Sequence, residues 1–400
     1  MTVMRRPTFR ITRRSFLASA ALFPAALRAM VKEPAGKHYR LLIGTSTKDA
    51  SKGIYAADWN PATGELSAAR LIAATPTPSF IAVSSAARSR GTVYACNEVE
   101  DFAGPKGPTK DGAVSAFRPD AQYDSLRSLS QLDSGGAGPC HVALDRTGRC
   151  LFTANYASGS VASYPVKADG SLGPMASFFQ FHGHGPNAAR QEGPHAHGSF
   201  PSPDNRFVLV NDLGTDRIHV FRLNAETAVL TPHDPPFFSV APGSGPRHLA
   251  FHPNGRWVYC VAEMGCTVSQ LAWDAAKGTL RLVGSVSSME KERTAADTAA
   301  EVAIDPSGQH LYASTRGADT ICVFSIHSGT GALSLVQSVS SGGRTPRHFT
   351  LDGTGRWLLA ANQTTGNVVV FRRDPAAGTL KATGAECQAP AATCVVFAEA

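Results

Sequence analysis

Two histidines near the middle of the chain are the first candidates for chemistry. His195 and His197 lie in residues 191–198, which read QEGPHAHG, and they follow a Gly-Pro pair at the start of an expected β-strand. Side chains at positions i and i+2 of a strand point the same way, so both imidazoles are expected to face one cavity. Imidazole titrates near neutral pH, where it can move protons or bind a metal. The alternative is a pair of structural histidines that closes a turn.

A turn of the type Asp-x-x-Gly-Arg recurs along the chain between short apolar and β-branched strands. Its last position falls at Arg149, Arg206, Arg256, Gln309 and Arg356. The intervals are 57, 50, 53 and 47 residues. A period of about 50 residues with four strands in each unit is typical of a β-propeller. The chain is therefore predicted to be all-β.

Counting these units predicts a seven-bladed β-propeller with four antiparallel strands per blade, in one domain over residues 38–398. The first unit, residues 39–74, contains only three strands, and residues 390–397 form a lone strand at the other end. We expect this C-terminal strand to complete the first blade, because closing the ring removes an unpaired sheet edge. Residues 101–112 and 180–191 are predicted to be loop insertions.

The repeat also predicts where polar side chains meet. In a propeller the innermost strands line a central channel, so the residues that open each first strand should converge there: His141, His195, His197, Arg247, His248, Arg347 and His348. The ends of the second strands form another column: Asn97, Glu98, Asn155, Tyr156, Asp212, Glu263, Arg316, Asn362 and Gln363. Burying such groups costs free energy unless they meet a polar ligand or each other. A water-filled, hydrogen-bonded channel is the alternative.

A metal site is the other chemistry that histidines offer. His182, His184, His195 and His197 are close in sequence, but the first two lie in a Gly-rich loop and no acidic ligand is fixed nearby. We therefore expect no metal and no other cofactor. The eight cysteines show no spacing typical of a metal knuckle, and several fall in apolar strand patterns that favour buried thiols.

The net charge of +7 comes almost entirely from the N-terminus. Six arginines and no acid lie in the first thirty residues, which leaves 32 basic and 31 acidic residues in the rest. This balance shows no basic stripe, so nucleic acid is not an expected partner.

The basic N-terminus is predicted to direct export. Residues 12–17, TRRSFL, resemble the twin-arginine signal, and the apolar run at 17–27 is too short for an ordinary transmembrane helix. We expect a signal peptide over residues 1–30, a periplasmic protein and no stable membrane anchor after cleavage. The alternative is an uncleaved amphipathic anchor.

Several motifs in order resemble the lactonase family of seven-bladed propellers. They are EGPHAH with the following Ser-Pro-Asp, then VNDLG at 210–214, then GPRH at 245–248. That family includes propeller-type 6-phosphogluconolactonase and fungal carboxymuconate cyclase, and the similarity extends over nearly the whole chain after Lys37. Ala262, Thr315 and His348 depart from residues that the family commonly has.

The resemblance implies a site at the channel mouth that is made of a His, a Glu and two Arg. By motif these are His195 or His197, Glu263, Arg247 and Arg316. Glu263 would take a proton from water, a histidine would protonate the leaving oxygen, and the arginines would hold an oxyanion, carboxylate or phosphate. We expect further substrate contacts from His141, Asn155, Asp212, His248, Arg347 and Asn362. No serine or cysteine nucleophile motif is present.

These features predict an exported lactonase, a carboxylic-ester hydrolase that acts as a monomer on a small, sugar-derived lactone. A muconate-type cycloisomerase would use the same residues to move a carbon-bound proton. A non-catalytic periplasmic scaffold is the third possibility, because propellers serve many functions.

Overall fold

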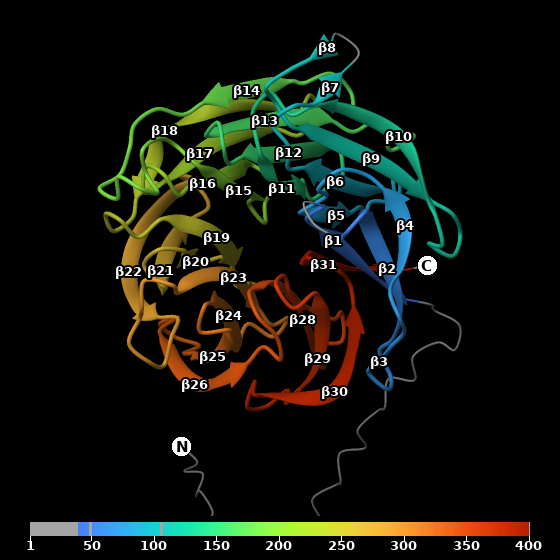
Figure 1. Cartoon of the computed structure of the whole chain (residues 1–400). Coiled ribbons are helices and arrows are strands. Elements are labelled where there is room, and N and C mark those ends of the chain that lie inside the picture. The colour runs from blue at the N-terminus through green and yellow to red at the C-terminus, as the bar shows by residue number, and fades with distance from the viewer. Residues whose placement is uncertain (1–38, 48–49, 105–106, 400) are drawn as a thin grey trace, which may run out of the picture. The chain divides into compact units, whose positions relative to one another are not determined.

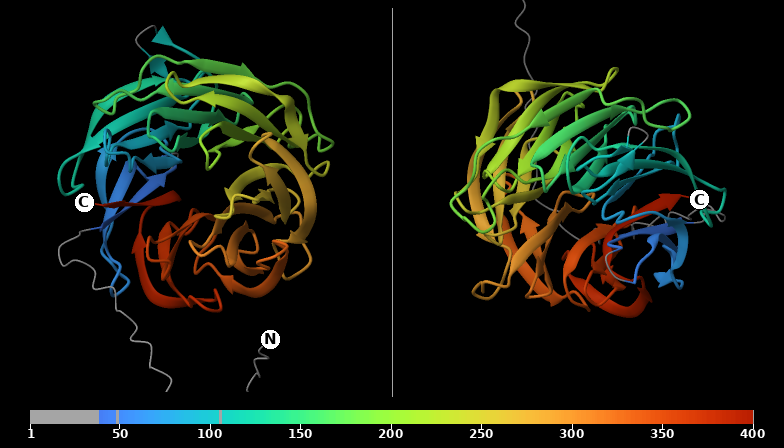
Figure 2. Two further views of the ribbon diagram at one scale, coloured as in Figure 1. Left: turned by 180° about the vertical axis from the view of Figure 1, so that it is seen from behind. Right: turned by 45° about the horizontal axis from the view of Figure 1, so that its top comes forward.

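The computed structural model describes residues 39–47, 50–104 and 107–399, and the predicted signal peptide lies outside them. The described residues form strands and turns, and among them no helix is long and apolar enough to cross a membrane. Seven antiparallel sheets follow one another around a central axis, as Figure 1 shows and as the reverse view in Figure 2 repeats. The predicted seven-bladed, all-β fold is confirmed.

Blades 1 to 3 contain strands β1–β6 and β9–β14 together with the last strand, β31. Blade 1 has β1 (Tyr39–Thr45), β2 (Gly53–Asn60), β3 (Glu65–Leu66), β4 (Arg70–Ala74) and β31 (Ala392–Glu399). Blade 2 has β5 (Ile81–Val83), β6 (Val93–Asn97), β9 (Ala113–Pro119) and β10 (Leu126–Asp133). Blade 3 has β11 (Pro139–Leu144), β12 (Cys150–Asn155), β13 (Ser160–Pro165) and β14 (Ser177–Gln180). The short hairpin β7 (Ala103–Gly104) and β8 (Gly107–Pro108) lies in the predicted insertion at 101–112.

Blades 4 to 7 use consecutive strands. Blade 4 has β15 (Ala196–Pro201), β16 (Phe207–Asp212), β17 (Arg217–Asn224) and β18 (Val229–Ser239). Blade 5 has β19 (Pro246–Phe251), β20 (Trp257–Ala262), β21 (Thr267–Asp274) and β22 (Thr279–Ser287). Blade 6 has β23 (Thr298–Ile304), β24 (His310–Arg316), β25 (Thr320–Ile326) and β26 (Leu333–Ser340). Blade 7 has β27 (Pro346–Leu351), β28 (Trp357–Asn362), β29 (Asn367–Arg373) and β30 (Leu380–Gln388).

The two ends of the described chain close the ring within blade 1. Strand β31 pairs antiparallel with β1 from Tyr39 opposite Glu399 to Thr45 opposite Ala392. The predicted closure by the C-terminal strand is thus confirmed. The outer strand of this blade is divided, because β3 and β4 both pair with β2.

The recurrent Asp-x-x-Gly-Arg turn has a clear physical basis. Asp145 Oδ1 accepts hydrogen bonds from the backbone N–H groups of Arg149 at 2.6 Å and Cys150 at 2.8 Å. Gly148 takes a φ of +63°, which residues with a Cβ rarely adopt. Asp305 and Asp352 accept equivalent bonds in blades 6 and 7. The repeated aspartate therefore holds the turn that joins the first and second strands of each of these blades.

Apolar side chains fill the spaces between neighbouring blades. Trp59 of blade 1 and Trp357 of blade 7 meet edge to face with their ring centroids 5.9 Å apart, within a buried cluster from both blades. Tyr312 and Phe349 belong to a similar cluster between blades 6 and 7. All eight cysteines lie in the described residues, where each is buried and none forms a disulfide. Burial of this apolar surface holds the innermost strands in a fixed ring.

Candidate functional site

A β-bulge at one place in the innermost strands sets the direction of the site residues. The register shifts between Pro139 and His141 in β11, between Ala196 and Gly198 in β15, and likewise in β19 and β27. The residues in these bulges are Cys140, His197, Arg247 and Arg347. A bulge changes where a side chain points and is common beside functional sites. Equivalent residues of four blades therefore enter one layer of the structure.

Glu263 lies beside two of these bulge residues, His197 and Arg247, and contacts three guanidinium groups. Its Oε1 is 2.6 Å from Arg190 Nη2, and its Oε2 is 2.8 Å from Arg316 Nη2 and 3.2 Å from Arg247 Nε. The Glu263 side chain is only 5% exposed. Burial alone would raise the pKa of Glu263, but Arg316, Arg247 and Arg190 outweigh it and hold the pKa far below its usual range. The carboxylate is therefore ionised and only weakly basic.

His197 is a buried, neutral imidazole beside this carboxylate. Its Nε2 lies 3.8 Å from Glu263 Oε2, and its Nδ1 lies 3.8 Å from Cys140 Sγ. Burial, and then the charge of Arg247, lower the pKa of His197 well below its ordinary value. At neutral pH the ring is therefore uncharged, and its protonated form is a stronger acid than ordinary imidazolium.

His195 occupies a different place from the one that simple strand alternation predicts. It precedes β15, its Nδ1 lies 2.9 Å from the Tyr156 carbonyl oxygen, and its Nε2 lies 3.2 Å from Glu192 Oε1. The Tyr156 ring stacks on His195 and meets His197 edge to face. Both imidazoles therefore border Tyr156, but the bulge gives them different partners.

A second group of polar residues, here called the axial cluster, lies on the axis of the ring. It consists of Phe80, His141, His248, Glu301 and His348, which come from blades 2, 3, 5, 6 and 7. His248 Nδ1 lies 2.9 Å from Glu301 Oε2, and His348 Nε2 lies 3.5 Å from the same atom. The Phe80 ring centroid is 4.3 Å from that of His141 and 5.3 Å from that of His348. Side chains from five blades meet in this way only at the axis.

The three histidines of the axial cluster are neutral at neutral pH because burial lowers their pKa values. Burial, and then neighbouring His248 and Arg247, lower the pKa of His141 well below its usual value. Burial and Arg247 also lower the pKa of His248 well below its usual value. Burial lowers the pKa of His348 to about 4, although Glu301 opposes it. Burial raises the pKa of Glu301. His248 Nε2 is buried without a hydrogen-bond partner in the described chain.

Two guanidinium groups keep N–H donors that the described residues do not use. Arg247 Nη1 donates to the Ala300 carbonyl at 2.7 Å, but its Nε, although 3.2 Å from Glu263, makes no hydrogen bond. Burial, and then the charges of Arg316 and Arg347, lower the pKa of Arg247 to about 9, so it is still cationic at neutral pH. Arg347 is half-buried and makes no hydrogen bond or ion pair with any other described residue. The Arg247 Nε is buried against Glu263, whereas the half-buried Arg347 keeps its donors for an anionic group.

Three predicted substrate contacts lie inside the blades instead. Asp212 accepts hydrogen bonds from the backbone N–H of His195 at 2.7 Å and from the Thr215 hydroxyl at 2.5 Å. Asn155 donates to the Ser134 carbonyl and Asn362 to the Ser341 carbonyl, and all three side chains are fully buried. They hold the ends of second strands and turns, and we leave them out of the site proposed below.

Sequence reasoning did not single out Arg190, Cys140 or Glu301 as site residues. Arg190 comes from the insertion at 180–191, and its only signal is a basic residue just before the QEGPHAHG motif. Its Nη2 also lies 3.3 Å from the Tyr156 hydroxyl. Glu301 could have been found from its place among the residues that open the first strands. Within the described residues, no three histidine, cysteine or acidic side chains are arranged to hold a metal.

The fold and the site together define a seven-bladed β-propeller with buried arginines, histidines and a carboxylate on its innermost strands. A family model for the seven-bladed β-propeller lactonases matches residues 40–397, and the chain belongs to this family. A 6-phosphogluconolactonase of Bacillus subtilis is 33% identical over 355 residues, covering 89% of this chain and 97% of the relative. A 6-phosphogluconolactonase of Formosa agariphila is 32% identical, over 85% of this chain and 94% of the relative. The structure of a periplasmic gluconolactonase of Pseudomonas aeruginosa matches with a TM-score of 0.81 and 31% identity, over 90% of this chain and 99% of that protein.

Proposed function

We propose that this protein is an exported lactonase, which hydrolyses a sugar-derived lactone at the mouth of the central propeller channel. One observation carries the proposal: three guanidinium groups surround the Glu263 carboxylate, and its Oε2 lies 3.8 Å from Nε2 of the neutral His197 imidazole. Family membership and relatives named lactonases support the reaction type.

The charges of the site suggest a division of roles that differs from the one expected from sequence. Both oxygens of the Glu263 carboxylate are already engaged by guanidinium groups, which leaves this side chain poorly placed to take a proton from water. In our mechanism Glu263 anchors Arg247 and Arg316, and His197 accepts the proton of the attacking water. The water oxygen bonds to the lactone carbonyl carbon, and the resulting oxyanion is stabilised by guanidinium N–H donors.

Breakdown of this intermediate uses the same imidazole. The bond between the acyl carbon and the ring oxygen breaks, and the imidazolium of His197 gives its proton to the departing alkoxide. Its lowered pKa favours this transfer, and the nearby Glu263 carboxylate stabilises the short-lived cation. The product is an open-chain hydroxy acid. Arg347, which has no partner among the described residues, is the group we assign to a substrate anion or oxyanion.

The substrate follows from the predicted export. Residues 1–30 lie outside the described structure, and we propose that they direct the protein to the periplasm by the twin-arginine route. Phosphorylated sugars are made mainly inside cells, so we favour an unphosphorylated sugar lactone. The test is acid release from glucono-δ-lactone and its 6-phosphate, followed by pH-stat with the purified full chain and corrected for spontaneous opening. No acceleration with any of a panel of lactones would exclude the proposed function.

The concentration of cations favours one alternative, a cycloisomerase acting on a muconate. A substrate with two or three carboxylates would match Arg247, Arg316 and Arg347, since guanidinium groups bind carboxylates well. Loss of ultraviolet absorbance from carboxymuconate, in the absence of lactone hydrolysis, would identify this activity instead.

A further inference from the structure

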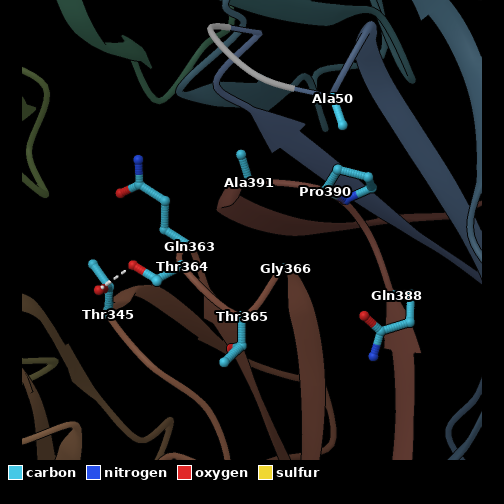
Figure 3. A pocket seen from close by; sticks show the side chains of 9 residues that line it. All are labelled: Ala50, Thr345, Gln363, Thr364, Thr365, Gly366, Gln388, Pro390 and Ala391. Carbon is cyan, nitrogen blue, oxygen red and sulfur yellow. Dashed lines mark hydrogen bonds between the residues drawn. The ribbon is translucent and has the colours of Figure 1, made fainter.

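An uncharged pocket of about 650 Å³ lies where the turns of blade 7 meet blade 1 (Figure 3). Its walls come from the residue before β27, the turn between β28 and β29, the end of β30 and the connection to β31. The lining residues are Ala50, Thr345, Gln363, Thr364, Thr365, Gly366, Gln388, Pro390 and Ala391. Its volume falls in the range of about 300–1,000 Å³ that is common for small-molecule sites.

The register of the strands places this pocket at the same end of the blades as the proposed catalytic residues, with blade 6 between blade 7 and Glu263 of blade 5. Pro346 pairs with Asn362 as Pro246 pairs with Ala262, so Gln363 takes the position in blade 7 that Glu263 takes in blade 5. The backbone N–H of Gln363 donates to the Thr345 carbonyl at 2.9 Å. Thr345 is two residues before Arg347, which has no partner among the described residues. The pocket thus opens on the same end of the strands as Glu263.

The lining groups are suited to neutral, hydroxyl-rich ligands. Three threonines and two glutamines provide hydroxyl and amide groups, which both donate and accept hydrogen bonds, and no lining side chain carries a formal charge. This contrasts with the arginine-rich layer around Glu263. A phosphate or carboxylate would favour the arginines, whereas sugar hydroxyls find matching partners here.

The Thr365 hydroxyl is already bonded to Asn367 and Arg344, but other polar groups of the pocket have hydrogen-bonding capacity to spare. The Gln363 side chain is half-buried and bonds to no other described residue, and Figure 3 shows its amide extending away from the backbone of the turn. The Thr345 and Thr364 hydroxyls lie 2.7 Å apart. One hydroxyl donates to the other, so one O–H donor is left for a ligand.

We infer that this pocket is a subsite for an uncharged sugar unit attached to the lactone ring, so that the enzyme prefers a disaccharide lactone to glucono-δ-lactone. The preference for a disaccharide lactone rests on the proposed function, whereas the binding of a neutral sugar in this pocket is independent of it. The pocket is larger than the hydroxymethyl tail of one lactone ring needs, which favours a second sugar unit.

The catalytic test compares kcat/KM for cellobiono-δ-lactone and glucono-δ-lactone. We expect the wild type to prefer the disaccharide lactone, and Gln363→Ala to reduce the ratio of the two kcat/KM values by about 5- to 10-fold, which is the scale of one or two lost hydrogen bonds. Gln122→Ala, at an exposed glutamine in a turn of blade 2, is the matched control and should keep the wild-type ratio. An unchanged ratio in Gln363→Ala, or no wild-type preference, would overturn the inference.

A binding test separates this inference from the proposed function. Saturation-transfer NMR with cellobiose as a neutral probe should show contact with the wild type and a weaker signal with Gln363→Ala. If neither lactone is hydrolysed but cellobiose binds in this way, the function fails and the subsite stands. If cellobiose gives no signal with the wild type, or the same signal with the variant, the subsite is wrong whatever the activity. Equal melting temperatures would show that the variant is folded.

Discussion

Arg190 Nη2 donates a 2.6 Å hydrogen bond to Glu263 Oε1, although the two residues are 73 positions apart in the chain. The donor comes from a loop insertion before blade 4 and the acceptor from the end of β20 in blade 5. This contact adds a third guanidinium group to the two that the sequence placed near Glu263. It also ties the loop at 180–191 to the proposed catalytic residues.

Replacing Arg190 tests the role of this loop. We expect Arg190→Gln to lower kcat/KM for the preferred lactone by about 10-fold, because losing a charged hydrogen bond costs roughly 1.5–3 kcal/mol, discounted here for a side chain that is 40% exposed. Arg190→Lys should retain an intermediate activity, since it keeps the charge. Arg146→Gln, at an exposed arginine in the turn of blade 3, is the control. Wild-type kcat/KM in Arg190→Gln would remove Arg190 from the site.

Replacing Glu263 tests the centre of the site. Glu263→Gln leaves three cations without their shared carboxylate, so we expect turnover per folded molecule to fall by roughly 10²-fold or more, the scale typical of losing a group that acts in the transition state. Stability should also fall, by about 3–5 kcal/mol, as when one partner of a buried ion pair is removed. Melting temperature and turnover are measured on the same preparation, with exposed Glu226→Gln as control. Normal turnover at a lowered melting temperature would make Glu263 purely structural.

The buried histidines predict acid sensitivity. Burial lowers the pKa of His348 to about 4, below the value of about 6.5 expected in the unfolded chain. The unfolded state therefore binds the proton first as the pH falls, and stability drops between about pH 6.5 and pH 4. For His348 this amounts to about 2 kcal/mol at pH 5 relative to pH 8.

Urea unfolding of His348→Gln at both pH values measures this contribution. We expect the variant to lose less stability than the wild type between pH 8 and pH 5. His327→Gln, at an exposed histidine, should behave like the wild type. The same pH dependence in His348→Gln and wild type would contradict the assignment.

Ring closure predicts a large effect of a small deletion. Removing residues 390–400 takes away β31 and leaves the buried edge of β1 without its partner. We expect loss of cooperative urea unfolding and exposure of apolar surface, because blade 1 then lacks its innermost strand. Removing Ala400 alone is the control. A truncated chain that unfolds cooperatively at the wild-type urea concentration would show that closure is dispensable.

Export predicts a phenotype at the N-terminus, which lies outside the described residues. Changing both Arg13 and Arg14 to Lys should retain the full-length precursor in the cytoplasm, because the twin-arginine receptor reads both arginines. Changing Arg5 and Arg6 to Lys keeps that pair and should leave export intact. Cell fractionation with immunoblotting measures both, and a periplasmic Arg13/Arg14 variant would refute the proposed route.

The sequence alone determined the blade count, the strand order and the closure of blade 1. Each follows from a local pattern: a turn whose aspartate accepts backbone hydrogen bonds, recurring about every 50 residues, and two incomplete end segments that complement each other. The repeat also placed Glu263, Arg247 and Arg316 among many polar residues at positions where packing alone would favour small or apolar ones, and the resemblance to the lactonase family singled out these three.

Tertiary structure decided which of these side chains meet. Strand alternation placed His195 and His197 on one face, but a bulge, which depends on pairing with β16, gives them different partners. Asn155, Asp212 and Asn362 looked equivalent to site residues, yet their hydrogen bonds to turns keep them inside the blades. Arg190 and Glu301 reach their positions only because distant blades are brought around one axis. Sequence periodicity describes each blade separately, whereas the charges around Glu263 result from packing between blades.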